Sequence, residues 1–177
     1  MIRIPADALV LLMGASGSGK STFALRHFDA AAVVSSDRLR GALTGDEADQ
    51  EATVMAFSRL HQWVEARLAA GVLAVVDATN TDWMRRAELI ARARLGGRPA
   101  IAIALDLPLE RCLERNAARR RTVRSAVIRR QHEELRRDLA RLDLEGFAAV
   151  HVLRSVIEVD AVVLEIEKGP VARALSS

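Results

Sequence analysis

Five runs of apolar residues alternate along the chain with longer stretches whose apolar positions recur every three or four residues. Each run is continuously apolar, which is the pattern of strands buried on both faces of a parallel sheet. The runs are Leu9–Met13, Ala32–Ser35, Val72–Val76, Ala100–Leu105 and Ala149–Leu153. This pattern predicts an α/β fold with a five-stranded parallel core flanked by helices.

The stretches between the runs carry helical periodicity and helix-start patterns. A long helix is predicted between the second and third runs, where one apolar stripe follows the helical period. Its members are Val54, Phe57, Leu60, His61, Val64 and Leu68. Asn80-Thr81-Asp82 and Pro108 are each expected to open a further helix. Ser155, with Glu158 three residues later, has the pattern of a capping box for the last helix.

The same periodicity assigns individual side chains to the core or the surface. We assign the apolar stripe of the long helix and Trp83 to the core. His61 is expected to pack against that core, and His132 is expected to lie on the surface. Neither histidine has a partner at metal-ligand spacing, so no metal site is predicted there.

The first apolar run leads directly into GASGSGKS, which has the pattern G-x-x-x-x-G-K-S. A strand before it and a helix after it give the context of a phosphate-binding loop. Its glycines let successive N–H groups turn inward, and Lys20 reaches the terminal phosphates. The Ser21 hydroxyl can bind Mg²⁺. We predict a nucleotide site made by Gly14, Ala15, Ser16, Gly17, Ser18, Gly19, Lys20, Ser21 and Thr22.

The second apolar run ends in SSDRLRG, which places a carboxylate and two guanidinium groups after a buried strand. Ligands of parallel α/β sheets bind beyond the carboxyl ends of the strands, so Asp37 is expected beside the phosphate loop. There it can accept a proton from an incoming hydroxyl. Arg40, one helical turn later, can bind an anionic group of the acceptor. A plain helix cap at Asp37 is the alternative, and the two roles are compatible.

Two more segments contribute candidate residues. Asp77 ends the third run, where an acid can hold metal-bound water or a nearby guanidinium, or simply begin a turn. Residues 116–127 link two helical patterns and hold four arginines within six positions. Positive side chains over a γ-phosphate stabilise the charge that spreads during transfer. This segment is therefore a candidate lid.

Composition and charge narrow the function classes. The formal net charge is only +3, yet the isoelectric point is about 9.9, and 24 of the 26 basic residues are arginine. Eleven of these arginines fall in residues 110–141 against five acids. Arginine binds phosphate bidentately, although a solvated helix face is the alternative for many of them. A single cysteine and the lack of any membrane-spanning run lead us to expect a cytoplasmic protein.

Four blocks together resemble the 5′-kinase domain of bacterial polynucleotide kinase-phosphatase, an RNA end-healing enzyme, and more distantly phage polynucleotide kinase. The blocks are GASGSGKSTFA, VVSSDRLRGALTGDEADQ, VVDATNTDWMRRAELI and VIRRQHEEL. The resemblance covers about residues 9–163. It implies a P-loop kinase fold with strand order 2-3-1-4-5, the runs being numbered along the chain. From the sequence itself, we expect one kinase domain at residues 1–168 and a tail at 169–177 that begins with Gly169-Pro170.

The resemblance also implies roles for individual residues, with ATP and Mg²⁺ as cofactors. Asp37 would be the general base, Arg40 would hold the phosphate beside the acceptor hydroxyl, and Asp77 would orient that arginine. In the lid, Arg119 and Arg121 would contact the ATP phosphates. Arg120 and Arg124 are the alternatives for those two contacts. Bacterial relatives carry phosphatase and ligase modules after this domain, so partners that supply them on separate chains are expected.

Three function classes remain open at this stage. The first is an ATP-dependent kinase of polynucleotide 5′-hydroxyl ends, of RNA or DNA. The second is a P-loop kinase of a small metabolite, and the third is a nucleotide-switched module that binds nucleic acid. The arginine excess favours a polyanionic acceptor, and the scarcity of aromatic residues argues against base stacking along a strand. We therefore expect a polynucleotide 5′-hydroxyl kinase that recognises chain ends.

Overall fold

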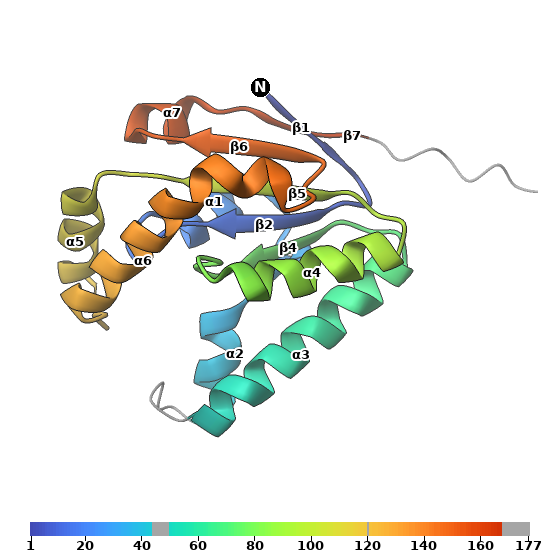
Figure 1. The fold of residues 1–177 in the computed structure, drawn as a ribbon, viewed down its shortest axis with the longest axis horizontal. Helices are drawn as coiled ribbons and strands as arrows, with labels where there is room; N and C mark the ends of the chain where they lie inside the picture. The colour runs from blue at the N-terminus through green and yellow to red at the C-terminus, as the bar shows by residue number, and fades with distance from the viewer. Residues whose placement is uncertain (44–49, 120, 168–177) are drawn as a thin grey trace, which may run out of the picture.

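The computed structural model describes residues 1–43, 50–119 and 121–167 (Figure 1). Its centre is a five-stranded sheet in which every neighbouring pair is parallel. In spatial order the strands are β3 (Val33–Ser35), β4 (Ala74–Asp77), β2 (Leu9–Met13), β5 (Ala100–Leu105) and β6 (Ala149–Leu153). Numbered along the chain, this is the order 2-3-1-4-5, so the predicted fold and topology are confirmed.

Helices cover both faces of the sheet, as Figure 1 shows. Alternate residues of each strand feed two separate cores, because successive side chains of a strand point to opposite faces. One core joins the strands to α1 (Lys20–His27), α5 (Leu109–Ala117) and α7 (Val156–Ala161). The other joins them to α3 (Gln50–Ala69), α4 (Trp83–Leu95) and the 3₁₀ helix η2 (Leu139–Leu144). Helix α6 (Ser125–Asp138) contributes Ile128 to the first core and Leu135 to the second.

Several boundaries and one small sheet depart from the sequence-based expectation. β3 begins one residue late because Ala30–Ala32 form a 3₁₀ turn, and β4 begins at Ala74 and ends on Asp77. Strands β1 (Ile2–Pro5) and β7 (Leu164–Glu167) pair in parallel and form a separate two-stranded sheet, which was not predicted. The expected tail at residues 169–177 lies outside the described residues.

Two apolar residues that the sequence analysis assigned to the core are exposed. Trp83 is the first residue of α4 and is 60% exposed, because the Asp82 cap starts the helix before its buried face begins. Val54 is 69% exposed, because the N-terminal end of α3 lies next to α2 (Ser36–Leu43) and away from the sheet (Figure 1). Leu60 and Val64, farther along the predicted stripe, are buried as expected.

The surface assignment of His132 was wrong as well. This side chain is buried, and its Nε2 atom lies 3.1 Å from the carbonyl oxygen of Leu107. His132 lies on the face of α6 that packs against the rest of the protein, between Ile128 of one core and Leu135 of the other. By contrast, Asp82 and Ser155 cap α4 and α7 through their side chains, as predicted.

The largest fully buried side chain in the described residues is a charged one, that of Arg86 on α4. Its guanidinium donates to Glu145 at 2.7 Å, to Asp138 at 2.9 Å and to the carbonyl oxygens of Asn80 and Thr81. Burial acts to lower the pKa of Arg86, but the hydrogen-bonded carboxylates outweigh it and hold that pKa above its usual value. Arg86 thus ties α6 and η2 to the segment after β4.

Removal of this guanidinium should be costly for stability. Arg86→Met is expected to lower the free energy of unfolding by about 3 kcal/mol, because two carboxylates and two carbonyls lose a buried donor. Arg92→Met is the matched control on the same helix: Arg92 pairs with Glu65 on the surface, where such a pair contributes at most about 1 kcal/mol. Urea denaturation of both variants measures the difference, and equal stability would contradict the inferred structural role.

No helix in the described part of the chain is both long enough and apolar enough to cross a membrane.

Candidate active site

The loop between β2 and α1 has the geometry of an anion-binding nest. Gly17 has a φ of 88°, a conformation that side chains with a Cβ rarely adopt. A Cβ at Gly17 would also lie 2.2 Å from the carbonyl oxygen of Cys112 on α5. Gly19 has a φ of 96° and precedes the first turn of α1, so the helix N-terminus points at the loop. Backbone N–H groups and the helix dipole together favour a phosphate there.

Lys20 lies across this loop and is buried. Its Nζ donates to the carbonyl oxygens of Gly14 at 2.9 Å and Ala15 at 3.0 Å. Burial lowers the pKa of Lys20 below its usual value, while the negative charges of Asp77 and Asp37 act in the opposite direction. A phosphate placed in the nest would give this ammonium a better partner than the two carbonyls.

Ser21 and Asp77 form the next contact of the site. The Ser21 hydroxyl donates to Asp77 Oδ2 at 2.7 Å, and Asp77 is buried at the end of β4. Because β3 and β4 pair in register at Ser35 and Asp77, the start of α2 lies beside the same carboxylate. Mg²⁺ is usually held by one or two protein oxygens together with water and substrate phosphates. The Ser21 hydroxyl and the Asp77 carboxylate fit that demand.

The structure brings four predicted polar residues together at the carboxyl edge of the sheet. Lys20, Ser21, Asp37 and Asp77 line one small hollow, and Arg119 of the lid segment completes it. This position at the edge follows from the rule for parallel sheets that the sequence analysis used.

Asp37 and Arg40 lie together on α2, one turn apart. Arg40 Nη2 donates to Asp37 Oδ1, so the predicted base and the predicted phosphate clamp contact each other. Asp77 binds Ser21 in this arrangement, and its role in orienting Arg40 stays a prediction. Arg40 Nε is buried and has no hydrogen-bond partner among the described residues.

Two hydrogen bonds of one residue, Asn116, connect the two ends of the lid segment. Asn116, at the end of α5, donates from Nδ2 to the carbonyl oxygen of Val123 and accepts from Val123 N–H, both at 2.9 Å. Arg119 faces the phosphate loop, while Arg121 and Arg124 line the larger cleft that Asp37 and Arg40 also line. Arg120 lies outside the described residues.

Sequence reasoning missed two contacts to the phosphate loop. Gln131 of α6 accepts a hydrogen bond from Ser16 N–H at 2.9 Å, and Arg115 of α5 donates to the carbonyl oxygen of Ser18 at 3.4 Å. Arg115 stands four residues before the first lid arginine, so its place on the same helical approach was a usable sign. Gln131 carried no such sign, because its partner is 115 residues away along the chain.

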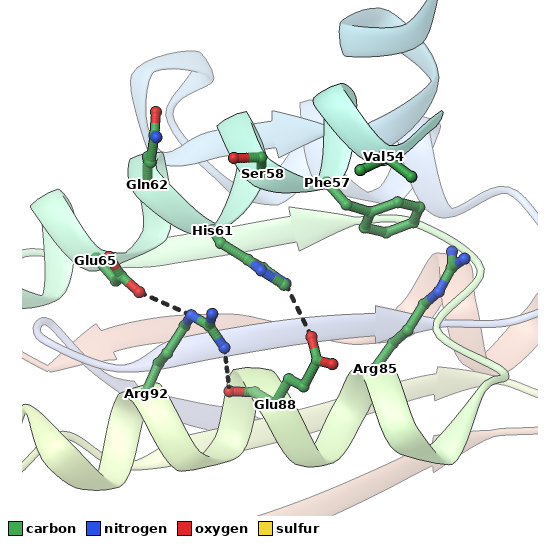
Figure 2. A pocket seen from close by; sticks show the side chains of 9 residues that line it. All are labelled: Val54, Phe57, Ser58, His61, Gln62, Glu65, Arg85, Glu88 and Arg92. Atoms are coloured by element: carbon green, nitrogen blue, oxygen red, sulfur yellow. Dashed lines mark hydrogen bonds and ion pairs between the residues drawn. The ribbon is translucent and has the colours of Figure 1, made fainter. Parts of the chain in front are cut away.

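Two hollows adjoin next to the site. The first, named the acceptor cleft after the role that we propose for it, has a volume of about 650 Å³ and extends from Asp37 and Arg40 to the lid segment. The second hollow, between α3 and α4, has a volume of about 470 Å³ (Figure 2). Phe57 of α3 and Arg85 of α4 line both, so these two side chains form the wall between them.

The fold and the phosphate loop define a P-loop kinase-type domain. Residues 9–142 match the AAA_33 family, an AAA domain, so the chain belongs to this family. No curated protein sequence matches the chain.

Solved structures share the fold at low sequence identity. A chain of the Pnkp1/Rnl/Hen1 RNA repair complex has a TM-score of 0.68 and 22% identity, over 81% of this chain and 48% of that one. Another structure of a Pnkp1/Rnl/Hen1 complex has a TM-score of 0.55 and 26% identity, over 66% and 40%. A gluconokinase from Sinorhizobium meliloti has a TM-score of 0.53 and 18% identity, over 85% and 83%. The chain thus spans less than half the length of the two repair-complex chains.

Proposed function

We propose that the protein is an ATP-dependent kinase that transfers a γ-phosphate to the 5′-hydroxyl end of a polynucleotide. One observation carries the proposal: a carboxylate on the acceptor side, Asp37, shares a hollow with the phosphate-loop residues Lys20 and Ser21. A nucleotide switch needs the loop but has no use for a base aimed at an acceptor. A kinase needs both groups within reach of one phosphoryl group.

On the donor side, the chain supplies positive charge and oriented N–H groups. The nest and Lys20 would bind the β- and γ-phosphates of ATP, and Ser21 with Asp77 would hold Mg²⁺. The metal ion would supply charge neutralisation at the phosphate oxygens. Arg119, which already faces the loop, would stabilise the negative charge that spreads over the transferring group.

On the acceptor side, Asp37 takes the proton of the 5′-hydroxyl as its oxygen attacks the γ-phosphorus. The bond from that phosphorus to the β–γ bridging oxygen breaks, and ADP leaves with the electron pair. Arg40 is bound to Asp37 before the acceptor arrives, so a phosphate of the acceptor can compete for the guanidinium. That exchange would free the carboxylate for proton transfer and hold the acceptor in place.

The charge of the acceptor cleft supports a polyanionic substrate. Four arginines line it: Arg40, Arg85, Arg121 and Arg124. Among the described residues, the acids that line it with them are Asp37 and Asp82, so this lining carries an excess of positive charge. A nucleotide end brings phosphates that guanidinium groups bind well, whereas a neutral sugar brings no anion. A kinase of a phosphorylated small metabolite is the second candidate, because one phosphate would also satisfy Arg40.

The salt dependence of acceptor binding separates these candidates. Binding of a 5′-hydroxyl oligonucleotide should weaken with salt, with a log–log slope near −1.4 if about two phosphates are contacted. Arg40→Gln should make that slope shallower by about 0.7, while Arg3→Gln, an exposed control on β1, should not change it. Fluorescence anisotropy measures the slopes. Transfer of γ-labelled phosphate to an oligonucleotide and to a metabolite panel runs beside it. Salt-independent binding, or transfer to small molecules alone, would contradict the polynucleotide assignment.

A further inference from the structure

Phe57 and Arg85 form a two-residue wall of the acceptor cleft. The Arg85 guanidinium carbon lies 3.8 Å from the centre of the Phe57 ring, well inside the range of cation–π contacts. Figure 2 shows the guanidinium of Arg85 beside the ring, at one end of the α3–α4 hollow. Among the described residues that line the acceptor cleft, Phe57 is the only aromatic one.

Arg85 is held in this position from a second direction. Its Nε lies 3.6 Å from Asp82 Oδ2, and Asp82 is itself fixed as the cap of α4 by accepting from Met84 N–H at 2.9 Å. The Arg85 side chain nevertheless remains 46% exposed. The guanidinium is therefore oriented by a ring and a carboxylate while a large part of its surface stays open to a ligand.

We infer that Phe57 and Arg85 form a stacking shelf for the nucleobase of the acceptor's 5′-terminal nucleoside. The inference rests on the proposed function and adds a recognition element to it. The 5′-terminal nucleotide of the acceptor presents three groups: the 5′-hydroxyl, a 3′-phosphate and a base. In the proposed reaction Asp37 contacts the hydroxyl and Arg40 binds the phosphate, so the base needs a flat surface in the same cleft. A guanidinium backed by an aromatic ring is such a surface.

The charges on the two sides of the wall agree with this assignment. In the α3–α4 hollow, Glu65 and Glu88 balance Arg85 and Arg92, with Arg92 Nε bound to Glu65 at 2.8 Å. Burial lowers the pKa of His61 in the same hollow, so this imidazole is neutral near pH 7. The hollow thus offers no net attraction to phosphates. The acceptor's phosphates would stay on the arginine-rich side and its uncharged base would lie at the wall.

A base-deletion experiment tests the shelf. Two 5′-hydroxyl trinucleotides of equal charge serve as acceptors, one complete and one with an abasic first residue. For the wild-type protein, kcat/KM should be higher for the complete acceptor by about tenfold or more, the contribution of one stacked base. Phe57→Leu and Arg85→Lys should bring the ratio close to one, because each should lower transfer to the complete acceptor much more than transfer to the abasic acceptor. Arg85→Lys is the sharper variant, because it keeps the charge and removes the planar face.

The matched control is Arg92→Lys, which lies two turns along α4 and lines only the α3–α4 hollow. It should keep the wild-type ratio. A direct readout uses 2-aminopurine as the first base: its fluorescence should be quenched on binding to the wild type and the control, and much less in the two shelf variants.

The outcomes separate the shelf from the proposed function. If oligonucleotides are phosphorylated but the wild-type ratio is near one, the shelf is wrong and the kinase assignment stands. The shelf is also overturned if kcat/KM falls equally for both acceptors in the variants, because Phe57 and Arg85 then only pack α3 against α4. Transfer to neither trinucleotide, with transfer to a small metabolite, overturns the proposed function and the shelf with it.

Discussion

Lys20→Ala and Ser21→Ala should each reduce phosphoryl transfer by at least about 10³-fold, the range of a single charged or hydrogen-bonding group that acts on the transition state. Among the described residues, the Lys20 ammonium bonds to two loop carbonyls, and in the proposed reaction a phosphate would replace them. The Ser21 hydroxyl bonds to Asp77, so in the proposed site its loss would leave one protein oxygen for Mg²⁺. Steady-state transfer with Mg·ATP measures both losses.

Conservative and distant variants control for damage to the fold. Ser21→Thr keeps the hydroxyl and should retain most activity, and Ser58→Ala on α3 removes a hydroxyl outside the nucleotide site. Thermal unfolding should show the two alanine variants of the loop folded, because neither side chain takes part in the apolar cores. Near wild-type turnover in a folded Lys20→Ala protein would mean that the loop does not serve the transfer reaction.

The sheet could be predicted because buried parallel strands leave an unambiguous pattern of continuous apolar runs. Residues Leu9–Met13 have no exposed surface, and β2 lies at the centre of the sheet as that pattern implies. The strand order came from the family resemblance and not from the runs themselves, since apolarity does not encode neighbours. Given the order, the convergence of Lys20, Asp37 and Asp77 follows from the geometry of parallel strands.

The remaining features depend on partners that local patterns do not reveal. Arg86 occupies a buried position that periodicity would give to an apolar residue, and its carboxylate partners are 52 and 59 residues away. The Asn116 side chain bonds to the backbone of Val123, and the Gln131 side chain accepts from the Ser16 N–H, and no hydrophobic pattern marks such contacts with backbone groups. His132 was assigned to the surface from the sequence, but its side chain is buried. Such contacts arise only when whole elements pack together.

Substitutions of Asp37 and Arg40 should reduce phosphoryl transfer in different ways, although the two side chains contact each other in the structure. Asp37→Asn keeps the size of the side chain and removes the base, so kcat should fall about 10²- to 10⁴-fold for every acceptor. Arg40→Ala removes a phosphate clamp, so its loss should depend on the acceptor. With a nucleoside 3′-phosphate or an oligomer, we expect kcat/KM to fall about 10- to 100-fold. With a bare nucleoside, which has no phosphate for Arg40 to bind, kcat/KM should fall much less.

The affinity for ATP should change little in either variant, because both groups line the cleft in which the acceptor is proposed to bind. The measurement is kcat and KM for both variants with a nucleoside, a nucleoside 3′-phosphate and a short oligomer. Equal losses of kcat/KM for Arg40→Ala with all three acceptors would rule out the phosphate-binding role of Arg40. A normal kcat for Asp37→Asn would rule out the role of Asp37 as the base. If both roles were ruled out, the Asp37–Arg40 pair would be an i,i+3 ion pair of α2, and the polynucleotide assignment would lose its main physical support.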